Sequence, residues 1–307
     1  MSAIRLQGVT KAYDGHVAVK DLELDIPLGG VFGLLGPNGA GKTTTLRMVM
    51  DIIAPDSGRI EILGRAADGA ARDAIGYMPE ERGLYPKMTL DEQLLFLAEI
   101  KGVSRRDALA RLAPWLERMG LAEWAKRKTN ELSKGMQQKA QFIAAVLHEP
   151  QVLILDEPMS GLDPLGADLM RETLLDLSRQ GKTLIVSSHQ METVERICDR
   201  VALIERGEKV LDGALSDIKA GHGGKTVALA YEGDGTFLSQ LPGVRSVRDF
   251  GRYVELSLAP DTMPHGLLPL IIDRVNLTRF EVVEPTLHAI FVDTVAARRA
   301  SAQGGRA

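Results

Sequence analysis

The sequence predicts an α/β fold built on a parallel sheet, followed by a second, smaller α+β unit. Three apolar runs, Val31–Leu35, Val152–Leu155 and Thr183–Ser187, are short and continuous, as in parallel strands that are covered on both faces. A turn and then a helical pattern follow each run, which is the order that builds a parallel sheet. The chain has 307 residues, a length typical of about two domains.

Composition narrows the class of protein. The 37 Lys and Arg residues against 41 Asp and Glu give a formal net charge of −4, so nothing favours a nucleic-acid partner. No run approaches the roughly 18 apolar residues of a membrane-spanning helix, and no secretory signal pattern is seen. The single cysteine, Cys198, excludes an internal disulfide and is most simply a small buried hydrophobe. We therefore expect a cytoplasmic protein.

The pattern becomes helical between about residues 88 and 150. Leu90–Gly102 and Arg105–Met119 carry apolar residues at helical spacing and few strand formers. Another helix is expected over Ser133–Pro150, with Ser133 placed to cap its start and Pro150 just beyond its end. The first domain, residues 1–220, is therefore predicted to hold a helical subdomain beside its sheet.

The glycine-rich run Gly221–Gly224 predicts a linker, and a second unit follows over residues 221–295. Its expected elements come in the order β-α-β-β-α-β of a ferredoxin-like unit. These elements are strands over Lys225–Glu232, Val244–Asp249, Arg252–Ala259 and Leu277–Val283, and helical segments over Thr236–Leu241 and Met263–Val275. A helix is expected over Thr286–Val295, and residues 296–307 are predicted to form a disordered tail.

A phosphate-binding loop follows the first apolar run. The stretch fits G-x-x-x-x-G-K-[ST] at every fixed position and leads into a helical pattern. Its nucleotide-binding candidates are Gly36, Pro37, Asn38, Gly39, Ala40, Gly41, Lys42, Thr43 and Thr44. Glycines let successive N–H groups face phosphate oxygens, and the helix N-terminus adds the positive end of its dipole. We expect Lys42 to contact the β- and γ-phosphates and Thr43 to offer its hydroxyl to Mg²⁺.

Two carboxylates follow the second apolar run, and His189 ends the strand expected over Thr183–Ser188. Beside a phosphate-binding loop, Asp156 is the candidate for holding Mg²⁺, through water. Glu157 can face the γ-phosphate and polarise a water, and His189 can orient that water or Glu157. Taken alone, a solvated acidic turn and a structural histidine would explain these residues; the neighbouring motifs favour catalysis by Glu157 and His189.

A second helix start offers another anion site. The sequence LSKGMQQ over Leu132–Gln138 brings a serine hydroxyl, a glycine N–H and a helix N-terminus together. One nucleotide needs only one phosphate-binding loop, so this second site is predicted to serve a nucleotide held by another subunit. In isolation the same stretch would be an ordinary serine cap.

The order of the phosphate-binding loop, LSKGMQQ, LDEP, SGLD and a histidine resembles the ATP-binding cassette (ABC) ATPase family over about residues 2–220. The resemblance implies a P-loop NTPase core that binds ATP with Mg²⁺ and hydrolyses ATP. Tyr13 resembles the aromatic residue that stacks on adenine. Contacts across a cassette dimer are implied for Ser133, Gly135, Met136, Ser160, Gly161 and Asp163.

Two positions depart from the family pattern. Glu80 follows Ile75–Pro79 where the family has a glutamine that reaches Mg²⁺. A carboxylate there can bind Mg²⁺ but would also repel the γ-phosphate, so the metal role of Glu80 stays open. The signature motif reads LSGGQ in most relatives, whereas this chain has Lys134 and Met136. Because Ser133 and Gly135, the two that touch phosphate, are kept, the anion site should survive.

Two further stretches resemble a bacterial group within the family. Residues Glu80–Ala98 and Glu284–Phe291 are similar to ABC-2-type exporters of the sodium-extrusion and drug-resistance kind. This implies a separate membrane-spanning permease, a second cassette that is identical or related, and a place on the inner face of the cell membrane through the permease. Arg82–Met88 is the candidate docking surface for the permease, although local core packing would explain the same apolar residues.

Two other functions compete with transport. A soluble ABC ATPase of DNA repair needs a long coiled coil, and Lys42 and Ser133 lie too close in sequence to enclose one. A translation-type ABC ATPase carries two cassettes in one chain, whereas this chain has one phosphate-binding loop. A regulatory module without turnover remains the third possibility, and Glu157 and His189 argue against it. Measured ATP hydrolysis separates that module from a transport ATPase.

Overall fold

The computed structural model describes residues 1–304 except 68–70, 72, 82, 223–225 and 260, and the side chains of 297 and 299–304 are not described. The chain divides into two compact units, Met1–Ala214 and Leu215–Ala307. The boundary precedes the expected one near residue 220, because α8 (Leu215–His222) groups with the second unit.

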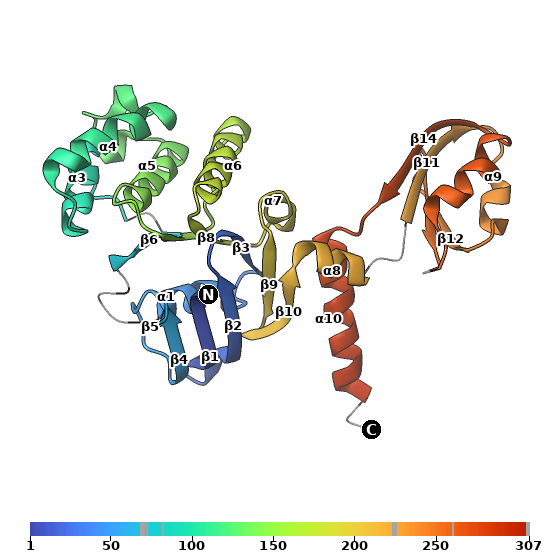
Figure 1. Cartoon of the computed structure of the whole chain (residues 1–307), viewed down its shortest axis with the longest axis horizontal. Coiled ribbons are helices and arrows are strands. Elements are labelled where there is room, and N and C mark those ends of the chain that lie inside the picture. Colours follow the sequence, from blue (N-terminus) through green and yellow to red (C-terminus); the bar gives the residue numbers. More distant parts are fainter. Residues whose placement is uncertain (68–70, 72, 82, 223–225, 260, 305–307) are drawn as a thin grey trace. The chain divides into compact units, whose positions relative to one another are not determined.

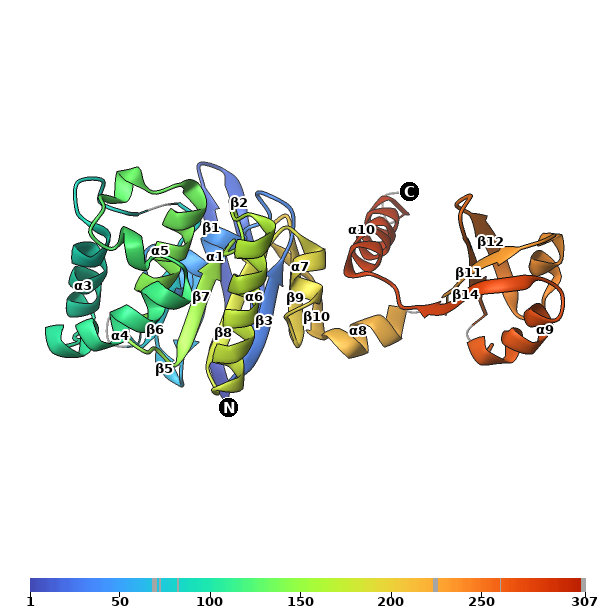
Figure 2. The same ribbon diagram turned by 90° about the horizontal axis from the view of Figure 1, so that it is seen from above.

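A six-stranded sheet in the order β10-β9-β3-β8-β7-β6 forms the centre of the first unit (Figures 1 and 2). The three expected strands are present, and every neighbouring pair from β9 to β6 is parallel, whereas β10 pairs antiparallel with β9. Their bounds are β3 (Gly30–Leu35), β6 (Ile75–Met78), β7 (Val152–Asp156), β8 (Thr183–Ser188), β9 (Arg200–Glu205) and β10 (Glu208–Ala214). Parallel pairing brings the carboxyl ends of these strands to one edge.

A second, antiparallel sheet, which the sequence analysis did not anticipate, completes the core. Its order is β2-β1-β4-β5, and in Figure 1 it lies on the opposite side of the six-stranded sheet from α5 and α6. Its strands are β1 (Ser2–Tyr13), β2 (His16–Pro27), β4 (Ser57–Ile62) and β5 (Arg65–Ala66). Helix α1 (Lys42–Val49) contributes Leu46, Met48 and Val49 to a buried cluster with side chains from both sheets. This packing anchors the helix that follows the phosphate-binding loop.

The predicted helical subdomain is present. Thr89 and Glu92 form a capping box at the start of its first helix, and Ser104 caps the next. Ser133 caps the third helix as predicted, since its Oγ accepts a hydrogen bond from Met136 N at 3.2 Å. The elements are α3 (Leu90–Ile100), α4 (Arg105–Arg118), η1 (Ala122–Trp124), η2 (Thr129–Glu131) and α5 (Lys134–Val146). Helices α6 (Pro164–Arg179) and α7 (Met191–Glu195) pack against the central sheet.

The second unit has the predicted ferredoxin-like strand arrangement. Its sheet is antiparallel throughout, in the order β12-β13-β11-β14, so each β-α-β connection leaves one strand between the two that it joins. The strands are β11 (Thr226–Glu232), β12 (Val244–Asp249), β13 (Val254–Leu258) and β14 (Asn276–Val283). The connections are η3 (Thr236–Gln240), η4 (Pro264–Leu267) and α9 (Leu268–Ile272). The single helix expected over Met263–Val275 is split because Pro269 lacks an N–H and lies in the first turn of α9.

The predicted linker and tail differ from the structure. Gly221 and His222 end helix α8, whereas Gly223 and Gly224 lie outside the described residues. Helix α10 (Leu287–Gly304) continues through residues 296–304, which were expected to be disordered, because this run is rich in the helix-favouring residue alanine. Lys219 Nζ lies 3.4 Å from Glu284 Oε2, and α8 contacts α10. Among the described helices, none combines the length and the apolar character needed to cross a membrane.

The lone thiol leads to a first prediction. Cys198 is buried, as expected, with its Sγ beneath Gly33 of β3. Burial, with a smaller contribution from the Asp199 carboxylate, raises the pKa of the Cys198 thiol. Because thiol reagents attack the thiolate, the native protein should react with Ellman's reagent at pH 8 at least about a hundredfold more slowly than the urea-unfolded chain. Rapid, complete labelling of the folded protein would contradict this placement.

Candidate functional site

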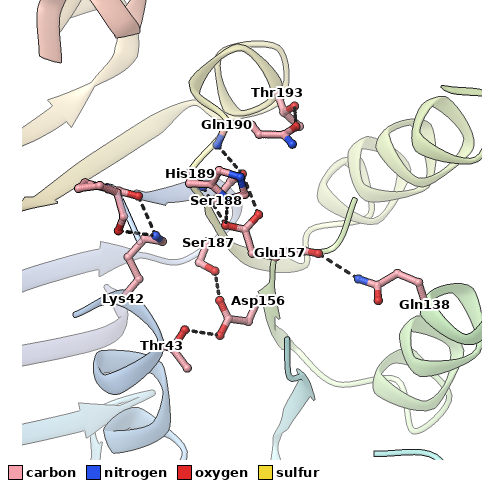
Figure 3. A network of polar contacts seen from close by, with 12 residues as sticks. Lys42, Thr43, Gln138, Asp156, Glu157, Ser187, Ser188, His189, Gln190 and Thr193 are labelled. Carbon is pink, nitrogen blue, oxygen red and sulfur yellow. Dashed lines mark hydrogen bonds and ion pairs between the residues drawn. The ribbon is translucent and has the colours of Figure 1, made fainter. Parts of the chain in front are cut away.

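The register of three parallel strands brings the predicted site together at one edge of the central sheet. Leu35, the last residue of β3, pairs with Ser188, and Asp156 at the end of β7 pairs with Ser187. The loop after β3, the two acids at the end of β7 and the histidine after β8 therefore lie at neighbouring positions of one edge, and Figure 3 shows Lys42, Thr43, Asp156, Glu157 and His189 together. Strand pairing rather than sequence distance places these groups together.

The phosphate-binding loop is tight, and two of its glycines have no room for a side chain. A Cβ built on Gly36 would lie 2.1 Å from Ile204 O, and one on Gly41 would lie 2.4 Å from Ala18 O. Gly41 also has a φ of 107°, a region that favours glycine. The loop is thus pressed against the backbone of β9 and β2, with its remaining surface left for a ligand.

Lys42 is folded back onto the loop that precedes it. Its Nζ donates hydrogen bonds to Gly36 O at 2.7 Å and to Pro37 O at 3.1 Å, and the residue is 6% exposed. Burial lowers the pKa of Lys42, while the nearby carboxylates of Glu157, Asp156 and Glu80 act in the opposite direction. The ammonium therefore lies at the loop that would cradle phosphates, among acids that favour its charged form.

The candidate magnesium ligands contact each other. Thr43 Oγ1 donates to Asp156 Oδ2 at 2.9 Å, and Ser187 donates to the other carboxylate oxygen of Asp156, which is fully buried. Across the described part of the chain no cluster of three or more His, Cys, Asp or Glu residues could hold a metal. Mg²⁺ commonly uses one or two carboxylates together with substrate phosphates and water. The hard oxygen donors of Thr43 and Asp156 fit an ion of that kind, completed by a nucleotide.

Glu157 and His189, which the sequence predicts to be catalytic, contact each other. Glu157 Oε1 accepts a hydrogen bond from His189 N at 2.8 Å and lies 2.6 Å from His189 Nδ1. Its other oxygen, Oε2, accepts from Ser188 Oγ at 3.2 Å. Glu157 is 8% exposed and has a φ of 50°, a left-handed conformation that is uncommon outside glycine and clusters at functional sites.

Glu157 lines two clefts, one of about 570 Å³ and another of about 510 Å³. The smaller is lined by Tyr13, His16, Ala18, residues 38–44, Glu80, Asp156 and Glu157. Tyr13 is 44% exposed, and Lys11 Nζ lies 5.6 Å from the centroid of its ring. Glu80 is exposed and shares this cleft with the two acids, so its position suits either metal binding or repulsion of phosphate. This cleft brings together most of the groups predicted for one nucleotide, whereas Gly36 and Pro37 do not line it and His189 lines the larger cleft.

The residues predicted to contact a second cassette do not line the smaller cleft. Gly135 at the start of α5 lies close to the loop that carries Gly161, since a Cβ on Gly135 would be 3.2 Å from Gly161 O. Asp163 caps α6 by accepting from Gly166 N at 2.7 Å, and Ser160 N donates to Glu157 O at 3.0 Å. Met136 N donates to Ser133 Oγ, so both belong to the capped first turn of α5. Their contact with another subunit stays a prediction.

Several site residues were missed in the sequence. Ser187 and Ser188 hold the carboxylates of Asp156 and Glu157, and their signal was a pair of hydroxyls at the end of an apolar strand. Gln138 donates to Glu157 O at 2.9 Å from within LSKGMQQ, a motif interpreted only for its first residues. His16 lines the cleft because it pairs with Tyr13 across a hairpin, which no local pattern indicated.

Comparison with known proteins agrees with this geometry. Residues 19–160 match the family model "ABC transporter", and residues 213–295 match "ATP-binding protein DrrA1-3-like, C-terminal domain". The chain is 41% identical over 294 residues to YhaQ of Bacillus subtilis (strain 168), described as an uncharacterized ABC transporter ATP-binding protein, covering 96% of this chain and 99% of that relative. It is 34% identical over 302 residues to the linearmycin resistance ATP-binding protein LnrL of the same organism, covering 94% and 97%.

A solved structure shows the same fold. It is described as the dimeric, post-hydrolysis state of an ATP-binding cassette bound to ADP and Pi. The match has a TM-score of 0.63 at 25% sequence identity, and it covers 69% of this chain and 98% of that one. With the family matches, this confirms the predicted P-loop NTPase core. The chain therefore belongs to the ATP-binding proteins of ABC transporters, and its cassette is an ATPase.

Proposed function

We propose that this chain is the ATP-hydrolysing subunit of an exporter, and that pairing of two ATP-loaded cassettes drives transport through a separate membrane permease. The observation that carries the proposal is the contact between Glu157 and His189 beside the cleft of the phosphate-binding loop. A regulatory nucleotide-binding module would have no use for a buried acid and histidine in contact at this position.

Nucleotide binding uses groups that are already in place. The N–H groups of the loop and the ammonium of Lys42 receive the phosphates, and the exposed ring of Tyr13 offers a face for the adenine to stack on. Thr43 and Asp156 would hold Mg²⁺, which, when bound, neutralises charge on the phosphate oxygens. Apart from the ammonium of Lys42, which must leave Gly36 O and Pro37 O to meet phosphate, the binding geometry is set before the ligand arrives.

Hydrolysis requires a base for the attacking water. Glu157 accepts the proton of a water that attacks the γ-phosphorus, and the bond to the ADP oxygen breaks, giving ADP and phosphate. Its carboxylate is kept in place by three contacts: Ser188 Oγ at 3.2 Å, the backbone N–H of His189 and the ring Nδ1 of His189. The side chain of His189 is 44% exposed and lines the larger cleft rather than the nucleotide cleft, so its role here is to orient Glu157.

The second cassette is proposed from the surfaces that the cleft does not use. Ser133, Gly161 and Asp163 are exposed, and they sit on neighbouring loops at the starts of α5 and α6. In a head-to-tail pair, the start of α5 would meet the γ-phosphate held by the other chain. A homodimer and a pair with a related cassette both satisfy this arrangement.

The permease and the export direction are proposed from a surface and a relative. Tyr85 is 53% exposed, and its ring meets that of Phe96, 41% exposed, edge to face at 6.4 Å between centroids. Its backbone is fixed on both sides, since Tyr85 N donates to Gln93 Oε1 at 2.9 Å and Tyr85 O accepts from Thr129 Oγ1 at 2.6 Å. An apolar patch on a fixed backbone suits docking of a membrane subunit from the cytoplasmic side; Arg82 of the predicted surface lies outside the described residues. The resistance named for LnrL agrees with export.

The role of Glu157 is tested by Glu157→Gln. The amide keeps the size of the side chain but cannot take a proton, so hydrolysis should fall at least about a hundredfold while ATP still binds. The variant should accumulate as an ATP-bound dimer in size-exclusion chromatography with Mg-ATP. The exposed Glu123→Gln serves as the matched control. A monomeric Glu157→Gln protein with wild-type turnover would disprove the assignment.

The role of Lys42 is tested by Lys42→Ala. Loss of a charged hydrogen-bond donor to the phosphates should weaken Mg-ATP binding at least about tenfold, measured by isothermal titration calorimetry. The control is Lys182→Ala, because Lys182 Nζ donates to Glu149 O at 3.0 Å and does not line the cleft. Equal dissociation constants for Lys42→Ala and the wild type would contradict the proposed binding site.

The departure at Glu80 is tested by Glu80→Gln. This carboxylate lines the cleft with Asp156 and Glu157, so its removal lessens repulsion of the γ-phosphate. Turnover is expected to be unchanged or a few-fold higher, measured as steady-state ATP hydrolysis over a range of Mg²⁺ concentrations. A collapse of turnover that excess Mg²⁺ restores would instead show that this chain uses Glu80 for the metal.

A further inference from the structure

Gln138 joins the start of α5 to the catalytic glutamate. The residue is 1% exposed and lies in the second turn of the helix that Ser133 caps. Its Nε2 donates to Glu157 O at 2.9 Å and to Pro158 O at 3.3 Å, and Figure 3 shows the amide reaching from α5 to Glu157. The side chain therefore holds the two peptide groups directly after the strand that carries Asp156.

These peptide groups set the direction of the Glu157 side chain. The backbone of Glu157 is left-handed, with a φ of 50°, and must be held there by its surroundings. Glu157 N donates to Ser187 O at 3.1 Å, and Glu157 O accepts from Ser160 N at 3.0 Å as well as from Gln138. Strand β8 thus fixes one side of this residue, while helix α5 fixes the other.

The other end of this connection is the predicted site for the second nucleotide. Ser133 begins α5, and Gln138 follows it by about 7.5 Å along the axis at a rise of ~1.5 Å per residue. A helix turn is stiff over this length, so a shift of the first turn carries the amide with it. Gly135 adds a second contact, because it packs against the loop of Gly161 that follows Pro158.

We propose that Gln138 is a positioning residue that couples a nucleotide at the start of α5, held by the second cassette, to the placement of this chain's own Glu157. The inference rests on the proposed pairing of cassettes. It adds a chain of contacts through which the nucleotide held by the second cassette affects Glu157, the proposed base of this chain. When the γ-phosphate bound by the second cassette draws in the first turn of α5, Gln138 moves the Glu157 peptide. The carboxylate of Glu157 then lies where it can take the proton of the attacking water. Each cassette then hydrolyses ATP efficiently only while its partner is loaded.

Gln137 provides a matched control within the same helix. Its Nε2 also donates to two backbone carbonyls, Thr129 O and Leu132 O, each at 3.2 Å. Those carbonyls precede α5, whereas the carbonyls held by Gln138 follow the catalytic strand. Substituting either glutamine with methionine removes the same donors and keeps a similar side-chain length.

The first test compares Gln138→Met with Gln137→Met in the full chain. Gln138→Met should lower kcat about tenfold and leave the Kd for Mg-ATP within twofold, because Gln138 does not line the nucleotide cleft. Gln137→Met should keep kcat within twofold of the wild type. Thermal unfolding midpoints of the two variants should agree; if Gln138→Met unfolds, Gln138→Asn replaces it, since its amide is one methylene too short. Equal kcat values for the pair, or a loss of affinity as large as the loss of kcat, would overturn the inference.

The second test is a double-mutant cycle with Ser133→Ala. If Gln138 transmits what Ser133 senses, the double variant Ser133→Ala/Gln138→Met should be no more than twofold slower than the slower single variant. If the fold-losses of kcat in the two single variants multiply in the double variant, the coupling is overturned. In the same cycle with Gln137→Met in place of Gln138→Met, the fold-losses of kcat should multiply. Failure of the proposed function looks different, because Glu157→Gln would then form no ATP-dependent dimer, whatever Gln138→Met does to kcat.

Discussion

The register of the parallel strands β3, β8 and β7 is the constraint on which the rest of the site depends. It places Leu35 beside Ser188 and Asp156 beside Ser187, so a loop, two acids and a histidine begin at one level of one sheet edge. A slip of one residue would turn Asp156 to the other face of the sheet, away from Thr43. The buried apolar run of each strand fixes that register, and the chemistry depends on the packing of residues that take no part in it.

Motifs that are local in sequence could be predicted well. The phosphate-binding loop needs its glycines, its lysine and a following helix within a few residues, and Gly36 and Gly41 do lie where a side chain would clash. The capped start of α5 and the strand that ends at Asp156 follow the same rule. The ferredoxin-like order of the second unit was also readable, because each of its strands alternates or is flanked by turns.

What depends on distant residues could not be read. The antiparallel sheet escaped notice because β1 pairs with β2 through several register shifts, which blur the alternation of a half-buried strand. The hydroxyls of Ser187 and Ser188 gain their role only when β8 lies beside β7. The role of Gln138 depends on its hydrogen bond to Glu157 O, a residue distant in sequence, so no local pattern distinguishes it from the neighbouring polar residues. The tail of α10 shows the converse, since alanine propensity extends a helix beyond the last apolar position.

In the folded-back position of Lys42, two backbone carbonyls of the loop occupy the ammonium that is predicted to bind phosphate. The ammonium already makes two hydrogen bonds to the carbonyls of its own loop, so phosphate does not fill a void of unmet polar groups. Under the proposed function, phosphate binding would exchange those bonds for bonds to phosphate, and release of product would restore them. Such an exchange would lower the net free energy gained when phosphate binds, and so would ease the release of product. An ATPase that must release ADP in every cycle would benefit from a lysine that can return to the carbonyls of its own loop.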